Sequence, residues 1–461
     1  MEQENPVIRW WVTTKDQRYL MEKGVTECKP TIETKALELN ADIHLKLNIS
    51  KQHQKMLGMG YSFEHSSCHN LLTLPKGERT RALELLLHPT QGNMNLWRLC
   101  IGTADFTGTP WYSYCDAPPL KDIKNAVEHV RKEFSTEKDE EMIIPIIKAA
   151  LEVREDIIFF ASPWSPPAWM KSTQNMCGGR LLPKFYPAYA EYLALFVQDY
   201  TQRGIPIYAI TVQNEPLHNT KSMPTCKWTA EEEQTFIRDH LGPLFKKKQF
   251  HTQIWCYDHN FSVAYRPAKY PQTLLQDPKA ARFVDGISFH HYDLWGWGRP
   301  KCMKKIDEKF PTIPSYFTEG SLFGLWGCLR LTRYLKNNAA SYNGWVPCID
   351  TDGKPNNGPF KCHETIIQRD VATNTLLINW DYYALAQFTR FIVPGSIRFE
   401  ITGNRKRGFE SIGFVTPKHE ICLIFTNKSS KPRRIEITHK DVKITLQILP
   451  KSVSTYLIKE N

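Results

Sequence analysis

Two glutamates, Glu215 and Glu319, stand where a pair of carboxyl groups could cleave a glycosidic bond. Each follows a short apolar segment, Glu215 within Asn214-Glu215-Pro216 and Glu319 directly before Gly320. A glycosidase that retains the configuration of its sugar holds two carboxyl groups roughly 5 Å apart, one to attack the anomeric carbon and one to protonate the leaving oxygen. A single glutamate after a strand is more often a cap or an ion-pair partner, so the pair is informative only if the fold brings both together.

The two glutamates need different surroundings, because the acid must keep its proton while the nucleophile is ionised. Arg98 and Tyr292 are expected to hydrogen-bond Glu319 and keep it charged. Glu215 is expected to lack such a cation and to hold its proton. These expectations make Glu319 the nucleophile and Glu215 the general acid/base, with Asn214 bonding the sugar 2-hydroxyl in the transition state.

The elements that must position these residues follow a regular pattern. From about residue 55 onward, short apolar runs alternate with helical stretches eight times, which is typical of parallel β/α architecture. No GxGxxG or Walker A motif is present, so the pattern favours a closed (β/α)8 TIM barrel over an open nucleotide-binding sheet. The expected strands are Met59–Phe63, Asn95–Ile101, Asp156–Ala161, Ile207–Gln213, Gln253–Asp258, Gly286–His290, Pro314–Thr318 and Gly344–Ile349.

A barrel of this kind would bring the two glutamates together. Catalytic groups lie at the C-terminal ends of barrel strands, and strands 4 and 7, which precede Glu215 and Glu319, face each other across the barrel. Helices are expected within Leu120–Val153, over Phe185–Tyr200 and after Thr229, which is followed by three glutamates that suit a helix start.

Other polar and aromatic residues are predicted at the same end of the barrel. For any one of them a packing or ion-pair role is the commoner explanation, whereas their joint position after successive strands favours a site. His290 and His291, taken with the earlier His65, Cys68 and His69, match no zinc-binding spacing, so no metal and no organic cofactor are expected. The residues at this end are Asp105 after strand 2, Trp164 and Trp169 after strand 3, and His290 and Tyr292 at strand 6.

The two ends of the chain have a different pattern. Between residues 397 and 461, five short alternating segments separated by turn residues predict the antiparallel strands of a β-sandwich. Ala36–Ile49 alternates in the same way and has no partner nearby, so it is expected to join the C-terminal strands. The expected domains are therefore a side domain formed by residues 1–55 and 394–461 and a barrel formed by residues 56–393.

Composition limits the classes of partner. The formal net charge of +11 attracts anions, but the basic residues are scattered, and the densest cluster, Lys246–Lys248, has no interleaved aromatics. Nucleic-acid binding is therefore not expected, whereas a weak association with anionic membrane surfaces is. The aromatic content of 12% supplies flat apolar faces that suit a sugar site, although aromatic residues also simply pack cores.

The N-terminus and the cysteines predict a cytoplasmic protein. The start, from Met1 to Pro6, has no basic stretch followed by an apolar segment, so no signal peptide is expected. Without secretion the 12 cysteines are expected to be free thiols. No apolar run approaches the roughly 20 residues of a membrane span. Nothing in the sequence specifies an oligomeric state.

Five segments between Gly58 and Pro394 resemble the glycoside hydrolases of family 30, the glucosylceramidase family. The combination ASPW-x-x-P-x-W-x-K with NEP is the most specific part of the resemblance. It implies a barrel with a side domain built from both termini, which the end segments indicate independently. The five segments are Gly58–Phe63, Asn95–Phe106, Ala161–Lys171, Thr211–Pro216 and Phe317–Gly320.

The resemblance also implies roles for single residues. Glu215 matches the family's acid/base and Glu319 its nucleophile, with Arg98 and Tyr292 in support of the nucleophile. The positions implied to bind the sugar are Asp105, Trp164, Asn214, His290, Trp345 and Asn356. The implied activity is an exo-acting β-glucosidase of the glucosylceramidase type, working by double displacement without a cofactor.

Some segments depart from the family pattern and leave the leaving group open. Tyr61–His65 differs from the family's usual sequence, and the loops Pro110–Asp116 and Met223–Trp228 are distinctive. A ceramide, a sterol, another lipid or a sugar could occupy the leaving-group side. The alternatives are therefore a related glycosidase acting on β-xylosides, β-fucosides or β-1,6-glucan, or a non-catalytic barrel that binds glycolipid.

Overall fold

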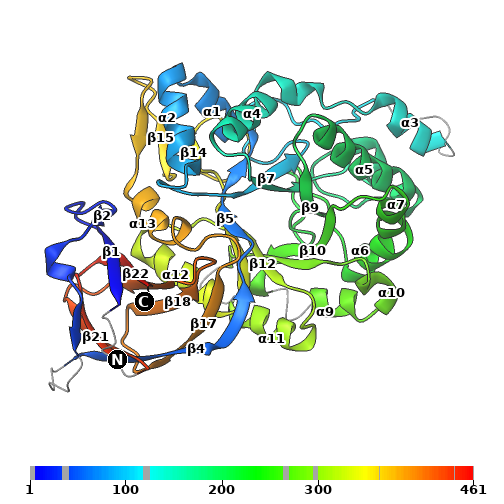
Figure 1. The fold of residues 1–461 in the computed structure, drawn as a ribbon. Coiled ribbons are helices and arrows are strands. Elements are labelled where there is room, and N and C mark those ends of the chain that lie inside the picture. The colour runs from blue at the N-terminus through cyan, green and yellow to red at the C-terminus, as the bar shows by residue number, and fades with distance from the viewer. Residues whose placement is uncertain are drawn as a thin grey trace.

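A computed structural model describes residues 6–33, 41–117, 125–262, 269–293, 299–362, 364–440 and 442–459. One nine-stranded and one ten-stranded sheet contain most of the strands, and helices surround the first of them (Figure 1). Within the described residues, no helix is both long and apolar enough to cross a membrane. All 12 cysteines are free thiols, as predicted.

The nine-stranded sheet closes into the predicted barrel. Its first strand is split at Tyr61 into β5 (Gly58–Gly60), which pairs with β13, and β6 (Ser62–Phe63), which pairs with β7, so the two pieces close the circle. All of its strand pairs are parallel. The remaining strands are β7 (Leu96–Ile101), β8 (Ile158–Pro163), β9 (Ile207–Thr211), β10 (Gln253–Asn260), β11 (Gly286–His290), β12 (Ser315–Glu319) and β13 (Ala339–Asn343).

The prediction of Gly344–Ile349 as the eighth barrel strand is wrong, because the eighth strand is the segment directly before it. The strand that closes the barrel is β13, whose small and polar residues pair with β5 at Ser341 opposite Gly58. The more apolar run after it leaves the barrel: Trp345 packs in a cluster above the strand ends. Its last residues form β14 (Cys348–Asp350), which joins β15 (Ile367–Arg369) and β16 (Leu376–Ile378) in a separate small sheet.

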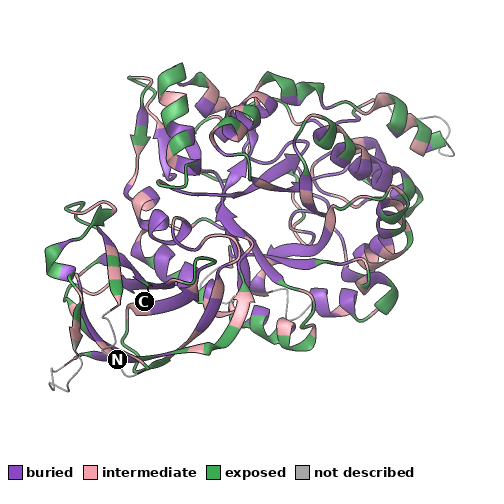
Figure 2. Cartoon of the chain, viewed as in Figure 1, coloured by how far each residue is buried: buried purple, intermediate pink, exposed green. Residues whose placement is uncertain are grey.

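Helices cover the outside of the barrel, which leaves the strands buried (Figures 1 and 2). The predicted cap is present at α6, where the Thr229 hydroxyl accepts from the Glu232 amide at 3.2 Å and the Glu232 carboxylate accepts from the Thr229 amide at 2.7 Å. The predicted stretch Leu120–Val153 begins outside the described residues and contains two helices. The helices are α1 (His65–Thr73), α2 (Lys76–Leu87), α3 (Ala126–Glu133), α4 (Ile143–Val153), α5 (Tyr186–Gln202), α6 (Ala230–Phe236), α7 (Gly242–Lys247), α9 (Tyr270–Leu275), α10 (Pro278–Ala281), α11 (Lys301–Lys309), α12 (Gly324–Lys336) and α13 (Trp380–Thr389).

The ten-stranded sheet forms the side domain from both chain ends, as predicted. Strand β4 lies between β17 and β20, antiparallel to the first and parallel to the second, so the N-terminal segment is inside the sheet rather than at its edge. Residues 36–40 of the predicted alternating segment lie outside the described residues. The strands are β1 (Val7–Thr14), β2 (Glu22–Lys23), β3 (Thr31–Glu33), β4 (Ile43–Lys55), β17 (Ile397–Gly403), β18 (Phe409–Val415), β19 (Ile421–Asn427), β20 (Arg433–His439), β21 (Val442–Ile448) and β22 (Ser452–Lys459).

The barrel interior is filled with large side chains. Trp255 stacks on Tyr316 with ring centroids 4.1 Å apart, and Leu96 and Phe160 belong to the same cluster. Burial of this apolar and aromatic surface stabilises the barrel. The polar residues that the sequence places after the strands lie beyond this filled interior, at the C-terminal strand ends.

Candidate active site

Glu215 and Glu319 meet at the C-terminal ends of β9 and β12. One carboxylate oxygen of each, together with a ring nitrogen of His290, falls within a set whose members all lie within 4.8 Å of one another. Glu319 is 5% exposed and Glu215 is partly exposed. The separation matches the roughly 5 Å that double displacement at a sugar requires, rather than the wider gap of inverting enzymes.

The backbone around Glu215 is held in an unusual conformation. Glu215 has a φ of 47°, and Tyr257 and Asp258 on the neighbouring β10 have φ values of 79° and 60°. The Glu215 amide donates to the Asp258 carbonyl at 3.0 Å, and the register of β10 against β11 shifts between Tyr257 and His259. Left-handed backbone at non-glycine residues is costly and is typical of sites where side-chain direction matters.

Arg98 joins the two glutamate-bearing strands. Its guanidinium is fully buried and donates to the Glu319 carboxylate, to Asn214 Oδ1 at 2.9 Å and to Asp258 Oδ2 at 2.8 Å. It also lies 4.8 Å from the ring centroid of Trp164, in a cation–π contact. One cation therefore fixes Glu319 and the amide beside Glu215 in a single arrangement.

Asp258 anchors this network, although the sequence predicts no role for it. Burial alone would raise the pKa of Asp258, but the charges of Arg98 and His290 outweigh burial and hold it well below its usual range. Its position at the end of the predicted fifth strand was a usable signal, because the other site residues follow strands in the same way. Its five donors are Arg98, Ser162, Thr211, His290 and Thr318, at 2.7–3.0 Å.

Two histidines contact Glu215, which corrects the expectation that this glutamate has no cationic neighbour. His290 Nδ1 lies 3.2 Å from Glu215 Oε1, and His259 Nδ1 lies 3.6 Å from the same oxygen. Burial would raise the pKa of Glu215, yet the charge of the nearby His259 and the hydrogen bond and charge of His290 bring it well below its usual value. Sequence reasoning missed His259, although it directly follows the fifth predicted strand.

His290 carries the proton in the free protein. Burial opposes its charge, but Glu319 and Asp258 raise the pKa of His290 to about 9. Its Nε2 is bonded to Asp258 at 3.0 Å, which leaves Nδ1 to donate toward Glu215. At neutral pH the site therefore holds an imidazolium beside an ionised Glu215, instead of a protonated Glu215.

Asp105 and two tryptophans line one side of the site. Asp105 is 5% exposed, and its Oδ1 has no hydrogen-bond partner. Burial and the charge of Glu319 raise the pKa of Asp105 to about 8. Trp164 and Trp345 stack with centroids 4.9 Å apart, so a flat apolar wall stands beside an unsatisfied carboxyl group. A polar ligand with hydroxyl groups suits this combination.

Tyr292 lies beside Glu319, whereas the hydrogen bonds of the Asn356 side chain are made within its own turn and not to either glutamate. Tyr292 is 38% exposed as a whole, but the surroundings of its hydroxyl and the charge of Glu319 raise its pKa well above the usual value, so the hydroxyl stays protonated and able to donate. The Asn356 side chain instead closes its own turn, with Nδ2 donating to the Phe360 carbonyl at 2.6 Å and Oδ1 accepting from Gly358 at 2.9 Å.

Glu215, His290 and Glu319 form the one group among the described residues that could hold a metal ion. The buried guanidinium of Arg98 contacts Glu319, and a second cation there would meet its repulsion. The sequence also contains a candidate metal set made of His290 and His291 together with His65, Cys68 and His69. These residues do not together form a group that could hold a metal ion in the described part of the chain.

Comparisons with known proteins agree with this geometry. Residues 56–324 match the glycosyl hydrolase family 30 TIM-barrel domain, and residues 395–456 match the family's beta sandwich domain. An endo-1,6-beta-D-glucanase of Neurospora crassa is 27% identical over 369 residues, which are 77% of this chain and 74% of that protein. The lysosomal acid glucosylceramidase of Mus musculus is 25% identical over 439 residues, covering 90% of this chain and 83% of the mouse protein.

A solved endo-beta1,6-glucanase has the same architecture throughout. It superposes with a TM-score of 0.84 at 25% identity, over 98% of this chain and 99% of that one. The barrel match alone covers more than half of the chain. The chain therefore belongs to glycosyl hydrolase family 30 and is a glycoside hydrolase.

Proposed function

We propose that the protein hydrolyses β-1,6-linked glucans by double displacement, with Glu319 as nucleophile and Glu215 as general acid/base. The observation that carries the reaction type is the placement of the two carboxylates within 4.8 Å at the ends of β12 and β9. Similarity to two β-1,6-glucanases, one of them a structure, supports this substrate over the glucosylceramide that the sequence motifs first suggested.

In the first step the Glu319 carboxylate attacks the anomeric carbon, and the bond to the leaving oxygen breaks as that oxygen takes a proton from Glu215. In the second step Glu215 removes a proton from water, which attacks the same carbon and releases Glu319. The guanidinium of Arg98 donates to the Glu319 carboxylate and fixes its direction. The phenol of Tyr292 can donate to Glu319, and the free oxygen of Asp105 can bind a sugar hydroxyl.

The proton that Glu215 gives to the leaving oxygen comes from the protonated His290. The 3.2 Å contact from His290 Nδ1 to Glu215 Oε1 is short enough for the proton to cross when the substrate excludes water and disfavours two charges. The leaving group from a β-1,6-linkage is a primary alkoxide, a poor leaving group, so this proton matters more there than with an aryl glucoside. Trp111 and Met223, from the two distinctive loops, pack in the same cluster as Trp164 and Trp345 and could contact the leaving sugar.

The test compares substrates in the wild-type protein and two variants. The wild type is expected to release reducing sugar from a β-1,6-glucan faster than it cleaves glucosylceramide, xylan or aryl β-xylosides and β-fucosides. Glu319→Gln should abolish turnover of every substrate, and a cyclophellitol-type inhibitor should label Glu319 in the wild type, seen by mass spectrometry. Near wild-type turnover by Glu319→Gln would rule out the assigned nucleophile.

Glu215→Gln separates the acid from the nucleophile. With a dinitrophenyl β-glucoside, whose leaving group needs no proton, the first step should survive, and added azide should restore turnover by replacing the water that Glu215 activates. With β-1,6-glucan the same variant should be inactive. Equal losses on both substrates would contradict the role of Glu215. A preference for glucosylceramide in the substrate panel would overturn the proposed substrate and leave the mechanism intact.

A further inference from the structure

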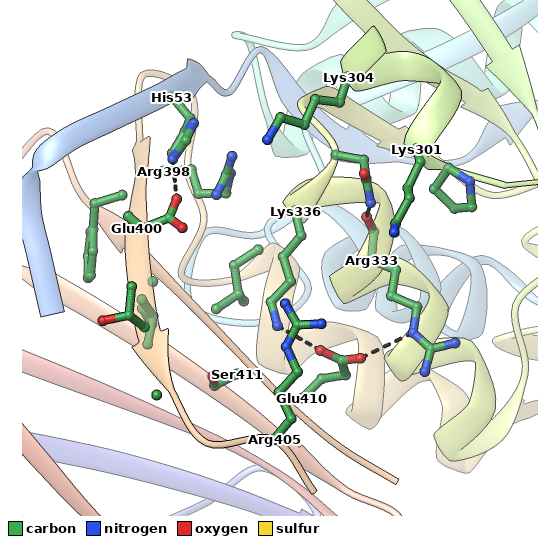
Figure 3. Close-up of a pocket in the computed structure, with 18 of the residues that line it drawn as sticks. His53, Lys301, Lys304, Arg333, Lys336, Arg398, Glu400, Arg405, Glu410 and Ser411 are labelled. Carbon is green, nitrogen blue, oxygen red and sulfur yellow. Dashed lines mark hydrogen bonds and ion pairs between the residues drawn. The ribbon is translucent and has the colours of Figure 1, made fainter. Parts of the chain in front are cut away.

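A hollow of about 840 Å³ lies between the barrel and the side domain, and none of the residues of the glutamate site lines it. We call it the interdomain groove. Helix α11 and the end of α12 form its barrel side, and β17, β18 and the turn between them form the other (Figure 3). The groove is large enough for a ligand the size of a phosphorylated sugar ring.

The interdomain groove is strongly basic. Nine Lys and Arg residues line it against three Glu residues, a surplus of six in a chain whose formal net charge is +11. More than half of the excess charge thus surrounds one hollow. Such a concentration of one sign, between low-dielectric walls, raises the local concentration of anions.

Two of the three glutamates are already bound to basic side chains. Glu400 accepts from His53 at 2.7 Å, and Glu410 accepts from Lys336 at 2.6 Å and from Arg333 at 3.1 Å. By contrast, within the described residues no carboxylate pairs with Lys301 or Lys304 on the barrel side, nor with Arg405 or Lys406 on the other. The groove therefore has uncompensated cations on both walls.

Arg398 supplies a buried cation among these lining residues. It is 6% exposed, and in the described part of the chain its guanidinium donates to two neutral groups, Gln54 Oε1 at 2.8 Å and Asn338 Oδ1 at 2.9 Å. Burial lowers the pKa of Arg398 to about 10, with Glu400 opposing the effect. Buried charges in proteins are ordinarily paired, and Arg398 makes no hydrogen bond to a carboxylate among the described residues, so its charge favours an anion in the groove.

We propose that the interdomain groove binds a compact ligand that carries several phosphate groups, either free or as the headgroup of a phosphorylated lipid. A single phosphate could contact only one wall, whereas cations face the groove from both (Figure 3). A flat anionic membrane would touch the rim and not the buried Arg398. Nucleic acid is disfavoured because the aromatic residues of the lining are not free for base stacking: Phe399 is buried and Phe409 stacks on Phe425.

The test measures the binding of inositol hexakisphosphate to the whole protein by isothermal titration calorimetry. The wild type should bind with an affinity that falls as salt rises. The double variant Lys301→Glu/Lys304→Glu reverses two exposed charges on α11 and should weaken binding at least about tenfold, since hydrogen bonds between oppositely charged groups are the stronger ones. The matched control Lys246→Glu/Lys247→Glu makes the same charge change on exposed residues of α7, outside the groove, and should bind within about twofold of wild type. Thermal melting of both variants checks that the fold is intact.

Sedimentation with phosphatidylcholine vesicles that contain phosphatidylinositol bisphosphate separates the two sources of phosphate. Vesicle binding that the hexakisphosphate displaces indicates a lipid headgroup, and hexakisphosphate binding without vesicle binding indicates a free ligand. Undetectable binding of the hexakisphosphate, equal weakening by the control variant, or tighter binding of a sulfated oligosaccharide would each overturn the proposal. None of these readouts depends on which glycoside the enzyme cleaves.

Discussion

The substitution Asp258→Asn tests whether one buried carboxylate holds the active-site network together. Asp258 is fully buried, and its charge balances Arg98 at 2.8 Å and His290 at 3.0 Å. Asparagine keeps the shape but places an NH2 group among side chains that are all donors to Asp258. The variant therefore loses a charge and gains an unsatisfied donor in the same buried place.

The expected loss of stability is large for an isosteric change. Removing one partner of a buried ion pair typically costs about 3–5 kcal/mol, because the remaining charge stays buried without compensation. At roughly 2 °C per kcal/mol for large domains, the Tm should fall by about 6 °C or more. Differential scanning calorimetry of wild type and variant at neutral pH measures this difference.

The control is Asp239→Asn, which removes the charge from an exposed ion pair. Asp239 accepts from Arg238 at 2.6 and 2.8 Å, geometry as good as that of Asp258. Exposed pairs contribute little, so the Tm should hardly change. Similar shifts in both variants would show that the burial of Asp258 does not matter and would refute the reasoning.

The same variant should also change how stability depends on pH. Burial opposes the charge of His290, but Glu319 and Asp258 raise its pKa to about 9, above the roughly 6.5 of an unfolded chain. Its protonation therefore stabilises the fold fully below about pH 6.5, and this contribution, about 3 kcal/mol, is lost as the pH rises to about 9. In Asp258→Asn the part of that decline that depends on Asp258 should disappear. An unchanged decline of Tm between pH 6.5 and 9 would show that Asp258 does not support the imidazolium.

Three further substitutions address single contacts. His259→Asn removes a positive neighbour of the Glu215–His290 pair, so the pair should lose its shared proton at higher pH and the basic limb of kcat/KM against pH should move up; an unmoved limb would contradict that coupling. Asp105→Asn should lower kcat/KM about 10–100-fold through an altered sugar hydrogen bond, with Tm little changed because the pKa of about 8 leaves the carboxyl largely neutral and the amide has the same shape; a large fall in Tm would indicate a structural role. Thr229→Ala breaks the capping box of α6 and should cost about 1 kcal/mol in urea unfolding without changing kcat/KM.

The sequence by itself determined the barrel and the approach of the two glutamates. Short apolar strands recur between helices, and barrel closure brings the ends of strands 4 and 7 together whatever the loops do. The alternating segments at both chain ends likewise determined a shared side domain, because Ala36–Ile49 had no local partner. These features depend on the spacing of apolar residues along the chain, which can be read from one sequence.

Only the tertiary structure decided which strand closes the barrel and where the proton lies. Ala339–Asn343 carries little apolar signal, and its role is defined by pairing with β5, a contact between residues about 280 positions apart. The charge state of Glu215 depends on His259 and His290, and that of His290 on Asp258 and Glu319. Electrostatic interactions of buried groups depend on distances of a few ångströms and on exclusion of water, and neither is a property of spacing along a chain.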